Sequence, residues 1–299
     1  MSLKQKNKEI LIVDGNNMLH RAYYKFSAMR SMSGTPTGIT YGFIYILKGL
    51  ISQLKPDDVY IIFDGGRSKE RMGILNSYKD REKKEGWDAD DFYRQKGLTN
   101  DMLTCLGVKV IEKKKTEADD MIWLLIRKLK RHNKITLISS DKDFNQCLSK
   151  EVQIWNPGKK CMVTIKNVEK LFGYKAESCV DYLILDGDAS DKIPGMPGVG
   201  PKTAIKFLNE YGSIYNYLDN PKFKFKKWDR GKLEEVYLRN RELIDLRLFV
   251  RKYLTSKDLI IKNENITEID LKEFSFICAD NSIRTFMQPS FIKQFKNLL

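Results

Sequence analysis

The chain has 299 residues, of which 53 are Lys or Arg and 39 are Asp or Glu, so its formal net charge is +14. Hydrophobic residues make up 42% of it, which is enough to bury a core and excludes global disorder. Eight Pro and 19 Gly exclude a collagen-like or linker-dominated chain. The excess of positive charge indicates a polyanionic partner, either a nucleic acid or an acidic membrane surface.

The sequence shows no signal for secretion or membrane insertion. The apolar run 10–13 stops at Asp14, and no window approaches the roughly 18 apolar residues of a membrane span. The five cysteines are scattered and form no C-x-x-C motif, which is typical of reduced thiols. We therefore expect a cytoplasmic protein without a membrane partner.

Short apolar runs alternate with helical patterns in the first two-thirds of the chain, which predicts an α/β layer. Apolar runs without alternation are typical of strands buried on both faces, so we expect a mostly parallel sheet. The predicted strands are 9–13, 59–63, 108–111 and 135–139, and the predicted helices between them are 38–54, 90–106 and 118–131.

The stretch 65–96 interrupts this alternation. It is rich in Lys and Arg, and it is too long for an ordinary strand-to-helix connection, which spans about two to six residues. Two interpretations are open: a functional lid or arch, and a solvated charged excursion.

The last part of the chain has a different pattern. At 152–165 an Asn-Pro-Gly-Lys turn between two apolar runs predicts a hairpin. Beyond it the pattern is helical, so we expect an α/β domain over 1–170 and a helical region over 171–299. The helices predicted there are 177–185, 202–211 and 231–253.

Aspartates follow three of the predicted strands. The strands run into Asp14, Asp64 and Asp141, and Asp143 lies two residues further on. Because the carboxyl ends of parallel strands share one edge of a sheet, these side chains are expected in one cleft. Their mutual repulsion raises their pKa values unless cations neutralise them. An all-oxygen ligand set favours Mg²⁺ or Mn²⁺.

Two further acidic groups fit the same cleft. The first opens the predicted helix 118–131 and contains Glu117, Asp119 and Asp120. The alternative interpretation is a helix start in which Thr116 is the N-cap and the acids favour the helix dipole. The second group follows helix 177–185 and contains Asp188 and Asp191. It lacks the Gly and Glu that an EF-hand calcium loop needs.

A glycine-rich loop at 193–203 is the most distinctive segment. It is not a P-loop, because Pro201 separates Gly200 from Lys202 and no strand precedes the motif. Glycines allow close backbone approach, and a helix N-terminus favours phosphate. The pattern therefore predicts a sequence-independent grip on a nucleic-acid backbone through Gly198, Gly200, Lys202 and Thr203.

In this order, the motifs resemble a known family, the structure-specific 5′-nucleases. That family includes flap endonucleases, the 5′-nuclease domain of DNA polymerase I, and stand-alone bacteriophage 5′-exonucleases and ribonucleases H. The likeness covers about residues 9–255, and no polymerase domain follows it, so a stand-alone enzyme is expected. The matching segments are V-D-G-N-N at 13–17, F-D at 63–64, E-A-D-D at 117–120, S-D-K-D-F at 140–144, G-D-A-S-D at 187–191 and G-V-G-P-K-T-A at 198–204.

The resemblance implies a PIN-like α/β fold with a helical arch at about 65–97 and a C-terminal helix–three-turn–helix motif. It also implies a phosphodiesterase that leaves a 5′-phosphate and uses two Mg²⁺ or Mn²⁺ ions about 4 Å apart. By position, the first metal ion would be held by Asp14, Asp64 and Asp119, with Glu117 close by. The second would be held or supported by Asp141, Asp143, Asp188 and Asp191, and Asp120 would assist from the outer shell.

The resemblance also implies DNA contacts. Arg71 and Lys79 match positions that stabilise the scissile phosphate, and Tyr78 and Arg81 match further arch residues, although the usual Tyr-Lys-x-x-Arg is one residue short here. His20 stands where the family has a base-stacking Tyr or Phe, and it is interpreted either as a stacking residue or as a polar residue of the first helix. The segment 198–204 would grip duplex DNA with a bound K⁺.

The implied activity is 5′-3′ exonuclease and flap endonuclease action during primer removal. Expected ligands are DNA with a 5′ flap, nick or overhang and RNA–DNA hybrids, and expected partners are replication proteins such as a single-strand-binding protein or a clamp. We expect a monomer. Two alternatives are a catalytically inactive DNA-binding member of the fold and a toxin-like ribonuclease. The complete set of nine acids disfavours the first, and the segment 198–204 disfavours the second.

Two smaller segments have two interpretations each. The alternation of Lys and aromatic residues at 222–228 fits a nucleic-acid groove or a Lys-rich edge over a modest core. The segment 288–295 resembles a sliding-clamp peptide, or it is a helix that packs back on the body.

Overall fold

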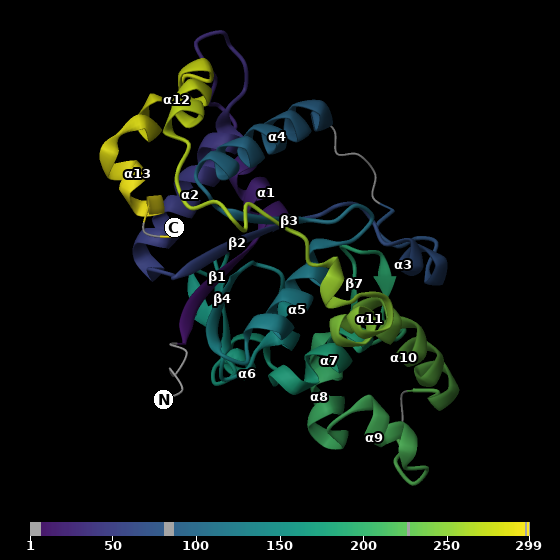
Figure 1. Cartoon of the computed structure of the whole chain (residues 1–299). Helices are drawn as coiled ribbons and strands as arrows, with labels where there is room; N and C mark the ends of the chain where they lie inside the picture. The colour runs from purple at the N-terminus through teal and green to yellow at the C-terminus, as the bar shows by residue number, and fades with distance from the viewer. Residues whose placement is uncertain (1–6, 81–86, 226–227, 297, 299) are drawn as a thin grey trace, which may run out of the picture.

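The centre of the protein is a seven-stranded sheet with the strand order β6-β5-β4-β1-β2-β3-β9 (Figure 1). The computed structural model describes residues 7–80, 87–225, 228–296 and 298. Neighbouring strands from β5 to β3 run parallel, whereas β6 and β9 pair antiparallel at the two edges. The strands are β1 (Lys8–Asp14), β2 (Asp58–Phe63), β3 (Lys109–Glu112), β4 (Asn133–Ile138), β5 (Val152–Asn156), β6 (Cys161–Val163) and β9 (Ile261–Lys262).

The register brings the ends of the three central strands level. Asp14 lies opposite Ile62 of β2, and Val13 lies opposite Ile138 of β4. The residues that follow β2 and β4 are therefore next to Asp14 at one edge of the sheet. This confirms the expected α/β layer with a mostly parallel sheet.

Helices cover both faces of the sheet. One face packs against α1 (Gly15–Phe26), α2 (Gly38–Leu54) and α4 (Ala89–Cys105). The other packs against α5 (Ala118–Leu129) and the helical region beyond it. That region contains α6 (Val168–Phe172), α7 (Cys179–Asp186), α8 (Pro201–Tyr211), α9 (Ile214–Asp219), α10 (Arg230–Ile244) and α11 (Leu246–Tyr253), together with a two-stranded ribbon of β7 (Gly187–Asp188) and β8 (Ile193–Pro194).

The predicted helix 231–253 is broken into two helices at Asp245. This residue has an extended backbone (ψ 95°), and its side chain accepts a hydrogen bond from the backbone N–H of Leu248 (2.9 Å). Asp245 thus ends α10 and caps the start of α11, which is a common role for aspartate. The prediction of one continuous helix was wrong at this position.

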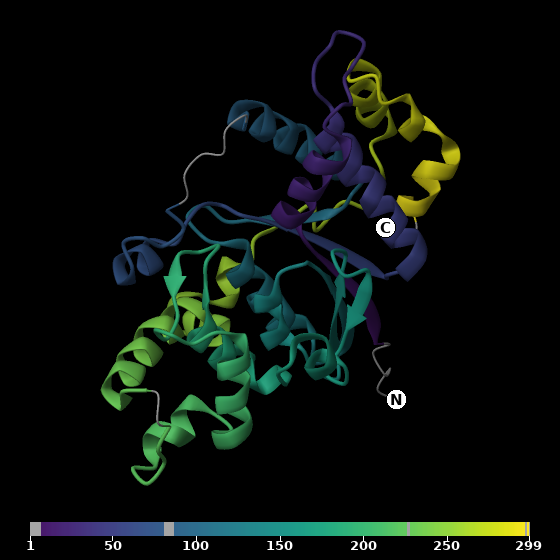
Figure 2. The same cartoon turned by 180° about the vertical axis from the view of Figure 1, so that it is seen from behind.

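The charged stretch 65–96 contains α3 (Lys69–Ile74) and the start of α4. Figures 1 and 2 show α3 projecting at the side of the molecule, away from α2 and from the last helix, α13 (Pro289–Lys296). Arg81, which the sequence singles out, lies outside the described residues.

The C-terminal helices pack on the α/β layer. Strand β9 joins the sheet edge beside β3, and α12 (Leu271–Asp280) and α13 (Pro289–Lys296) bury Phe274, Phe286 and Phe295 with α2 and α4. The side chain of Ser52 donates a hydrogen bond to Gln294 Oε1 (3.1 Å). The segment 288–295 is thus a helix packed on the body, and residues 261–296 lie with the N-terminal layer.

Among the described residues, no helix has the length and apolar composition needed to cross a membrane.

Candidate nuclease site

Asp14 is the central acid of the site. It ends β1 and caps α1: its Oδ1 accepts a hydrogen bond from the backbone N–H of Asn17 (3.0 Å), and its Oδ2 accepts one from Ser139 Oγ (2.9 Å). Ser139 Oγ also accepts a hydrogen bond from the backbone N–H of Asp141 (3.1 Å). This serine therefore joins the end of β1 to the start of the loop after β4.

Asp64 joins the end of β2 to the start of α5. Its Oδ1 accepts a hydrogen bond from the backbone N–H of Ala118 (2.7 Å), and Asp119 is the next residue of that first helical turn. The hydrogen bond satisfies one of the N–H groups that a helix start leaves unpaired. The α5 acids are thereby anchored to the strand-end acids.

Asp143 has a buried oxygen with no hydrogen-bond partner. Asp141 caps the 3-10 helix η1 (Lys142–Cys147) and accepts a hydrogen bond from the backbone N–H of Asp143 (2.9 Å). The Oδ1 atom of Asp143 is buried and finds no donor among the residues that the structure describes. A buried acceptor without a donor is costly, and a cation is a natural partner for it.

Asp188 belongs to the β7–β8 ribbon, which follows α7. Its Oδ1 accepts hydrogen bonds from the backbone N–H and the hydroxyl of Ser190 (both 2.7 Å). These bonds hold the turn that carries Asp191. The ribbon therefore presents two acids to the strand-end group.

The acids influence one another electrostatically. Burial and the neighbouring Asp64 and Asp141 raise the pKa of Asp14 to about 7, against hydrogen bonds that lower it. Burial raises the pKa of Asp119 and of Asp143 well above the usual range, and carboxylates nearby add to both shifts. Burial, together with Asp188 and Asp191, also raises the pKa of Asp141. The site is thus a concentration of negative charge that cations would relieve.

The donor set fits a hydrated divalent cation. In the described part of the chain, no three His, Cys, Asp or Glu side chains are arranged to hold one metal ion as they stand. Mg²⁺, however, keeps several waters and usually takes only one or two carboxylates directly. The oxygen-only donors and the unpaired Asp143 oxygen suit such an ion.

Lys79 places a positive charge within this acidic site. Its Nζ lies 2.6 Å from Glu117 Oε2 and 3.5 Å from Asp191 Oδ2, and its backbone has φ 50°. Burial opposes the charge of Glu117, but Lys79 and Arg71 outweigh it and lower the pKa of that carboxyl. Glu117 is therefore ionised, and its pair with Lys79 holds the charged stretch 65–96 next to the acids.

The side chains of Arg71 and Tyr78 lie inside the protein. The Arg71 side chain is 1% exposed, and both of its Nη atoms lie 2.7 Å from the carboxylate oxygens of Asp120. The Tyr78 side chain is 2% exposed and donates its hydroxyl to Glu117 Oε2 (2.8 Å). In this conformation both side chains are covered by protein, and Asp120 has both oxygens paired with Arg71.

His20 lies on the surface and stacks on two rings, which belong to the C-terminal part of the charged stretch 65–96. Its ring centroid lies 5.4 Å from that of Trp87 and 5.1 Å from that of Phe92. The sequence prediction missed Trp87, which follows the undescribed residues 81–86. It also missed Arg21, whose buried Nε has no partner among the described residues and which lines a hollow with Lys25 and Ser140.

The glycine-rich loop leads into α8 as expected. Gly198 has φ 72°, Gly200 is the N-cap, and Pro201 occupies the first helical turn. The carbonyl of Gly200 accepts hydrogen bonds from the backbone N–H groups of Thr203 and Ala204. Lys202 is exposed beside this turn.

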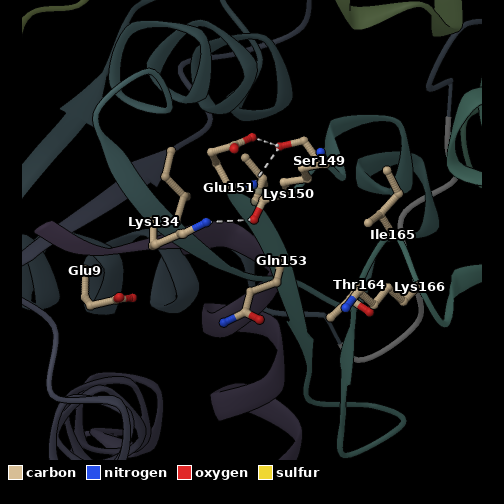
Figure 3. Close-up of a pocket in the computed structure, with 11 residues that line it drawn as sticks. Glu9, Lys134, Ser149, Lys150, Glu151, Gln153, Thr164, Ile165 and Lys166 are labelled. Atoms are coloured by element: carbon tan, nitrogen blue, oxygen red, sulfur yellow. Dashed lines mark hydrogen bonds between the residues drawn. The ribbon is translucent and has the colours of Figure 1, made fainter. Parts of the chain in front are cut away.

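Two pockets, at opposite ends of the central strands, are candidates for the functional site. One, of about 790 Å³, is lined by Asp64, Lys79, Glu117 and His20, so it belongs to the acidic site. The other, of about 670 Å³, lies at the opposite ends of β1, β4 and β5 (Figure 3). Its charged side chains do not converge: Lys134 Nζ bonds to the backbone of Lys150. The first pocket is therefore the candidate site.

Comparisons with protein families cover most of the chain. Residues 9–173 match the N-terminal resolvase-like domain of 5′-3′ exonucleases, and residues 174–267 match their C-terminal SAM fold. A 5′-3′ exonuclease from Aquifex aeolicus is 32% identical over 266 residues, which is 89% of this chain and 91% of the relative. DNA polymerase I of Thermus filiformis is 34% identical over 221 residues, which is 73% of this chain and 26% of the polymerase.

Solved structures share the fold. A bacteriophage T5 flap endonuclease in a pseudo-enzyme–product complex with DNA and metal ions has a TM-score of 0.70 at 20% identity and covers 92% of this chain and 99% of that chain. A T5 5′-exonuclease with bound zinc has a TM-score of 0.71 at 19% identity and covers 92% of this chain and 98% of that chain.

Proposed function

The chain belongs to the 5′-3′ exonuclease family, and from this premise we propose that it is a divalent-metal-dependent 5′-3′ exonuclease and flap endonuclease. It hydrolyses phosphodiester bonds near the 5′ ends of branched, nicked or RNA-primed duplexes and removes primers during DNA replication. The observation that carries this proposal is the group of acids at the ends of β1, β2 and β4 and at the start of α5. Within this group, burial and neighbouring carboxylates raise the pKa values of Asp14, Asp119, Asp141 and Asp143, which is typical of a site that binds cations.

Two Mg²⁺ or Mn²⁺ ions are assigned to these acids. Asp14, Asp64 and Asp119 would hold one, and Asp141, Asp143, Asp188 and Asp191 would hold or support the second. When bound, the ions lower the pKa of an attacking water and neutralise charge on the phosphate. The Oδ1 atom of Asp143, which has no partner among the described residues, supports this assignment. The T5 5′-exonuclease that shares the fold was solved with a bound divalent cation, zinc, which also supports it.

Lys79 is assigned to the scissile phosphate. Its ammonium group lies at the border of the candidate pocket, where it pairs with Glu117. A positive charge placed beforehand stabilises the negative charge that develops during phosphoryl transfer. The side chain therefore exchanges a carboxylate for a phosphate oxygen when DNA binds.

Arg71, Asp120 and Tyr78 are assigned as positioning residues. Arg71 ties α3 to α5 through Asp120 and to α10 through its Nε, which donates to the carbonyl of Leu243 (3.0 Å). Tyr78 fixes Glu117 from the neighbouring turn. They orient the residues that contact substrate and do not contact it themselves.

DNA contacts are assigned to two surfaces. His20 and Trp87 offer rings to an unpaired base, since aromatic side chains stack on bases of any sequence. The turn with Gly198, Gly200, Lys202 and Thr203 grips duplex phosphates, with K⁺ as a further ligand. We further propose cytoplasmic action as a monomer on DNA and RNA–DNA hybrids, with a single-strand-binding protein or clamp as partner.

The test is cleavage of a labelled 5′ flap and of an RNA-primed duplex, in Mg²⁺ and in EDTA. We expect products from both substrates in Mg²⁺, none in EDTA, and a loss of at least about 100-fold in rate for Asp141→Ala, as for removal of a key charge-stabilising group. Undiminished cleavage by Asp141→Ala would refute the metal assignment. DNA binding without cleavage in Mg²⁺ would indicate an inactive binding protein, and cleavage of single-stranded RNA alone a ribonuclease.

A further inference from the structure

A ladder of aromatic rings lies outside the nuclease site, between α2 and the C-terminal helices. Tyr45 stacks on Tyr41 (centroids 5.8 Å apart, planes 11° apart), and Tyr41 stacks on Phe286 (5.0 Å, 9°). Phe286 in turn stacks on Phe291 (4.3 Å, 20°). The half-buried Tyr41 and the buried Phe286 and Phe291 therefore support the outer ring, Tyr45, from one side.

The outer end of this ladder is open to solvent. Tyr45 is 50% exposed, whereas Phe286 is fully buried. The hollow beside it has a volume of about 460 Å³ and is lined by the ladder residues together with Lys48, Arg284, Thr285, Gln288 and Ser290. A planar group of the size of a nucleobase fits next to the exposed ring.

The charged side chains at this hollow are all positive. Lys48 is half-buried and Arg284 is exposed. The ammonium group of Lys48 and the guanidinium group of Arg284 have no ion-pair or hydrogen-bond partner among the described residues. Two cations that have no partner in the described part of the chain, beside a stacked ring, complement a ligand that joins flat rings to anionic groups.

We propose that Tyr45, Lys48 and Arg284 form a second binding site for single-stranded nucleic acid, separate from the nuclease site. A base stacks on the exposed face of Tyr45, and the adjoining phosphates pair with Lys48 and Arg284. None of these three residues lines the pocket of the nuclease site, and Figures 1 and 2 show α2 and α13 on the side of the molecule away from α3.

A nucleic acid explains the hollow better than a peptide does. Successive rings from Tyr45 through Tyr41 to Phe286 lie within 11° of parallel, so one more stacked plane continues the series. Stacking of this kind tolerates any base, in keeping with a chain of net charge +14. The proposal concerns binding alone, so it is tested in EDTA and does not depend on catalysis.

The first test is photocrosslinking of a short oligothymidylate that carries 5-iodouracil, followed by mass spectrometry. We expect crosslinks at Tyr45 or in its peptide in addition to those at the nuclease site. Tyr45→Leu should lower this crosslink about 5-fold or more, which corresponds to the low end of base–aromatic stacking, and Tyr45→Phe should retain it. The matched control is Phe276→Leu, which removes an exposed ring on α12 that has no place in the ladder.

The second test measures the salt dependence of crosslinking at Tyr45. Replacing both Lys48 and Arg284 with Gln should reduce the slope of log affinity against log salt by about 1.4, because each phosphate contact on a single strand contributes about 0.7. Crosslinks confined to other surfaces, or a Tyr45→Leu signal equal to wild type, would overturn the proposal. Capture of an acidic aromatic peptide with no crosslink to the oligonucleotide would overturn it in favour of a protein partner.

Discussion

Removing Arg71 should destabilise the whole protein, because its guanidinium is the only described partner of the Asp120 carboxylate. Both side chains are at most 1% exposed, and two hydrogen bonds of 2.7 Å join them. Arg71→Met leaves Asp120 buried and unpaired, and breaking a buried ion pair in this way costs about 3–5 kcal/mol. Met also loses the contact of the guanidinium with the Phe249 ring, whose centroid lies 3.7 Å from Cζ.

The double variant Arg71→Met, Asp120→Leu separates the pair from its surroundings. With both charges gone, no buried ion is left unpaired, so most of the lost stability should return. In the corresponding double-mutant cycle we expect a coupling energy of about 2–3 kcal/mol, the upper part of the range for residues in direct contact.

Urea unfolding of the four proteins at neutral pH in EDTA measures these free energies, and fluorescence anisotropy with flap DNA measures binding. A loss below about 1 kcal/mol for Arg71→Met, which is ordinary for a surface substitution, would refute the interpretation of a buried structural pair. Unchanged stability with a large loss of DNA affinity would show that Arg71 reaches the DNA, as the sequence alone suggested.

Lys79→Ala should lower kcat by about 100-fold while it changes the affinity for duplex DNA little, because the ammonium group acts at the scissile phosphate. Single-turnover cleavage measures kcat, fluorescence anisotropy measures the affinity, and Lys69→Ala on the exposed face of α3 is the control. Equal losses in kcat and in affinity would make Lys79 a general phosphate contact. Burial raises the pKa of Asp181 to about 6, although the backbone N–H of Ile214 opposes the shift. Because the folded state binds this proton more tightly than the unfolded state, the stability that Asp181 contributes is full below pH 3.8 and is lost as the pH rises through 6. Asp181→Asn should therefore flatten the fall in stability between pH 4 and 6 by up to ~2–3 kcal/mol, measured by urea unfolding, and an unchanged pH profile would contradict the shift.

The fold was largely predictable because its strands are buried on both faces. Helix α2 has the bounds expected from the sequence, since Gly38 and Lys55 mark its ends and apolar residues fill the turns between them. The break at Asp245 was not predictable from periodicity, because apolar residues continue on both sides of it and only the capping bond reveals the change in direction. The return of residues 261–296 to the N-terminal layer depends on long-range packing that a local pattern does not contain.

Part of the candidate site was likewise predictable from the sequence, and part was not. Asp14, Asp64 and Asp141 follow parallel strands, so topology alone brings them together. Arg71 lies in a stretch of charged residues whose composition is typical of a solvated segment. Nothing local indicates that it pairs inside the protein with Asp120, 49 positions later. The ring of Trp87 beside His20 was missed for a similar reason, since the two residues meet only in the folded chain.

The packing of α13 on α2 has a consequence for synthesis on the ribosome. The hydrogen bond between Ser52 and Gln294 spans 242 positions of the chain. At about 5–20 residues per second, α2 therefore waits about 10–50 s before its covering helix is made. During that time the nascent chain carries an apolar helix face without its partner, and exposed apolar surface of this kind favours aggregation.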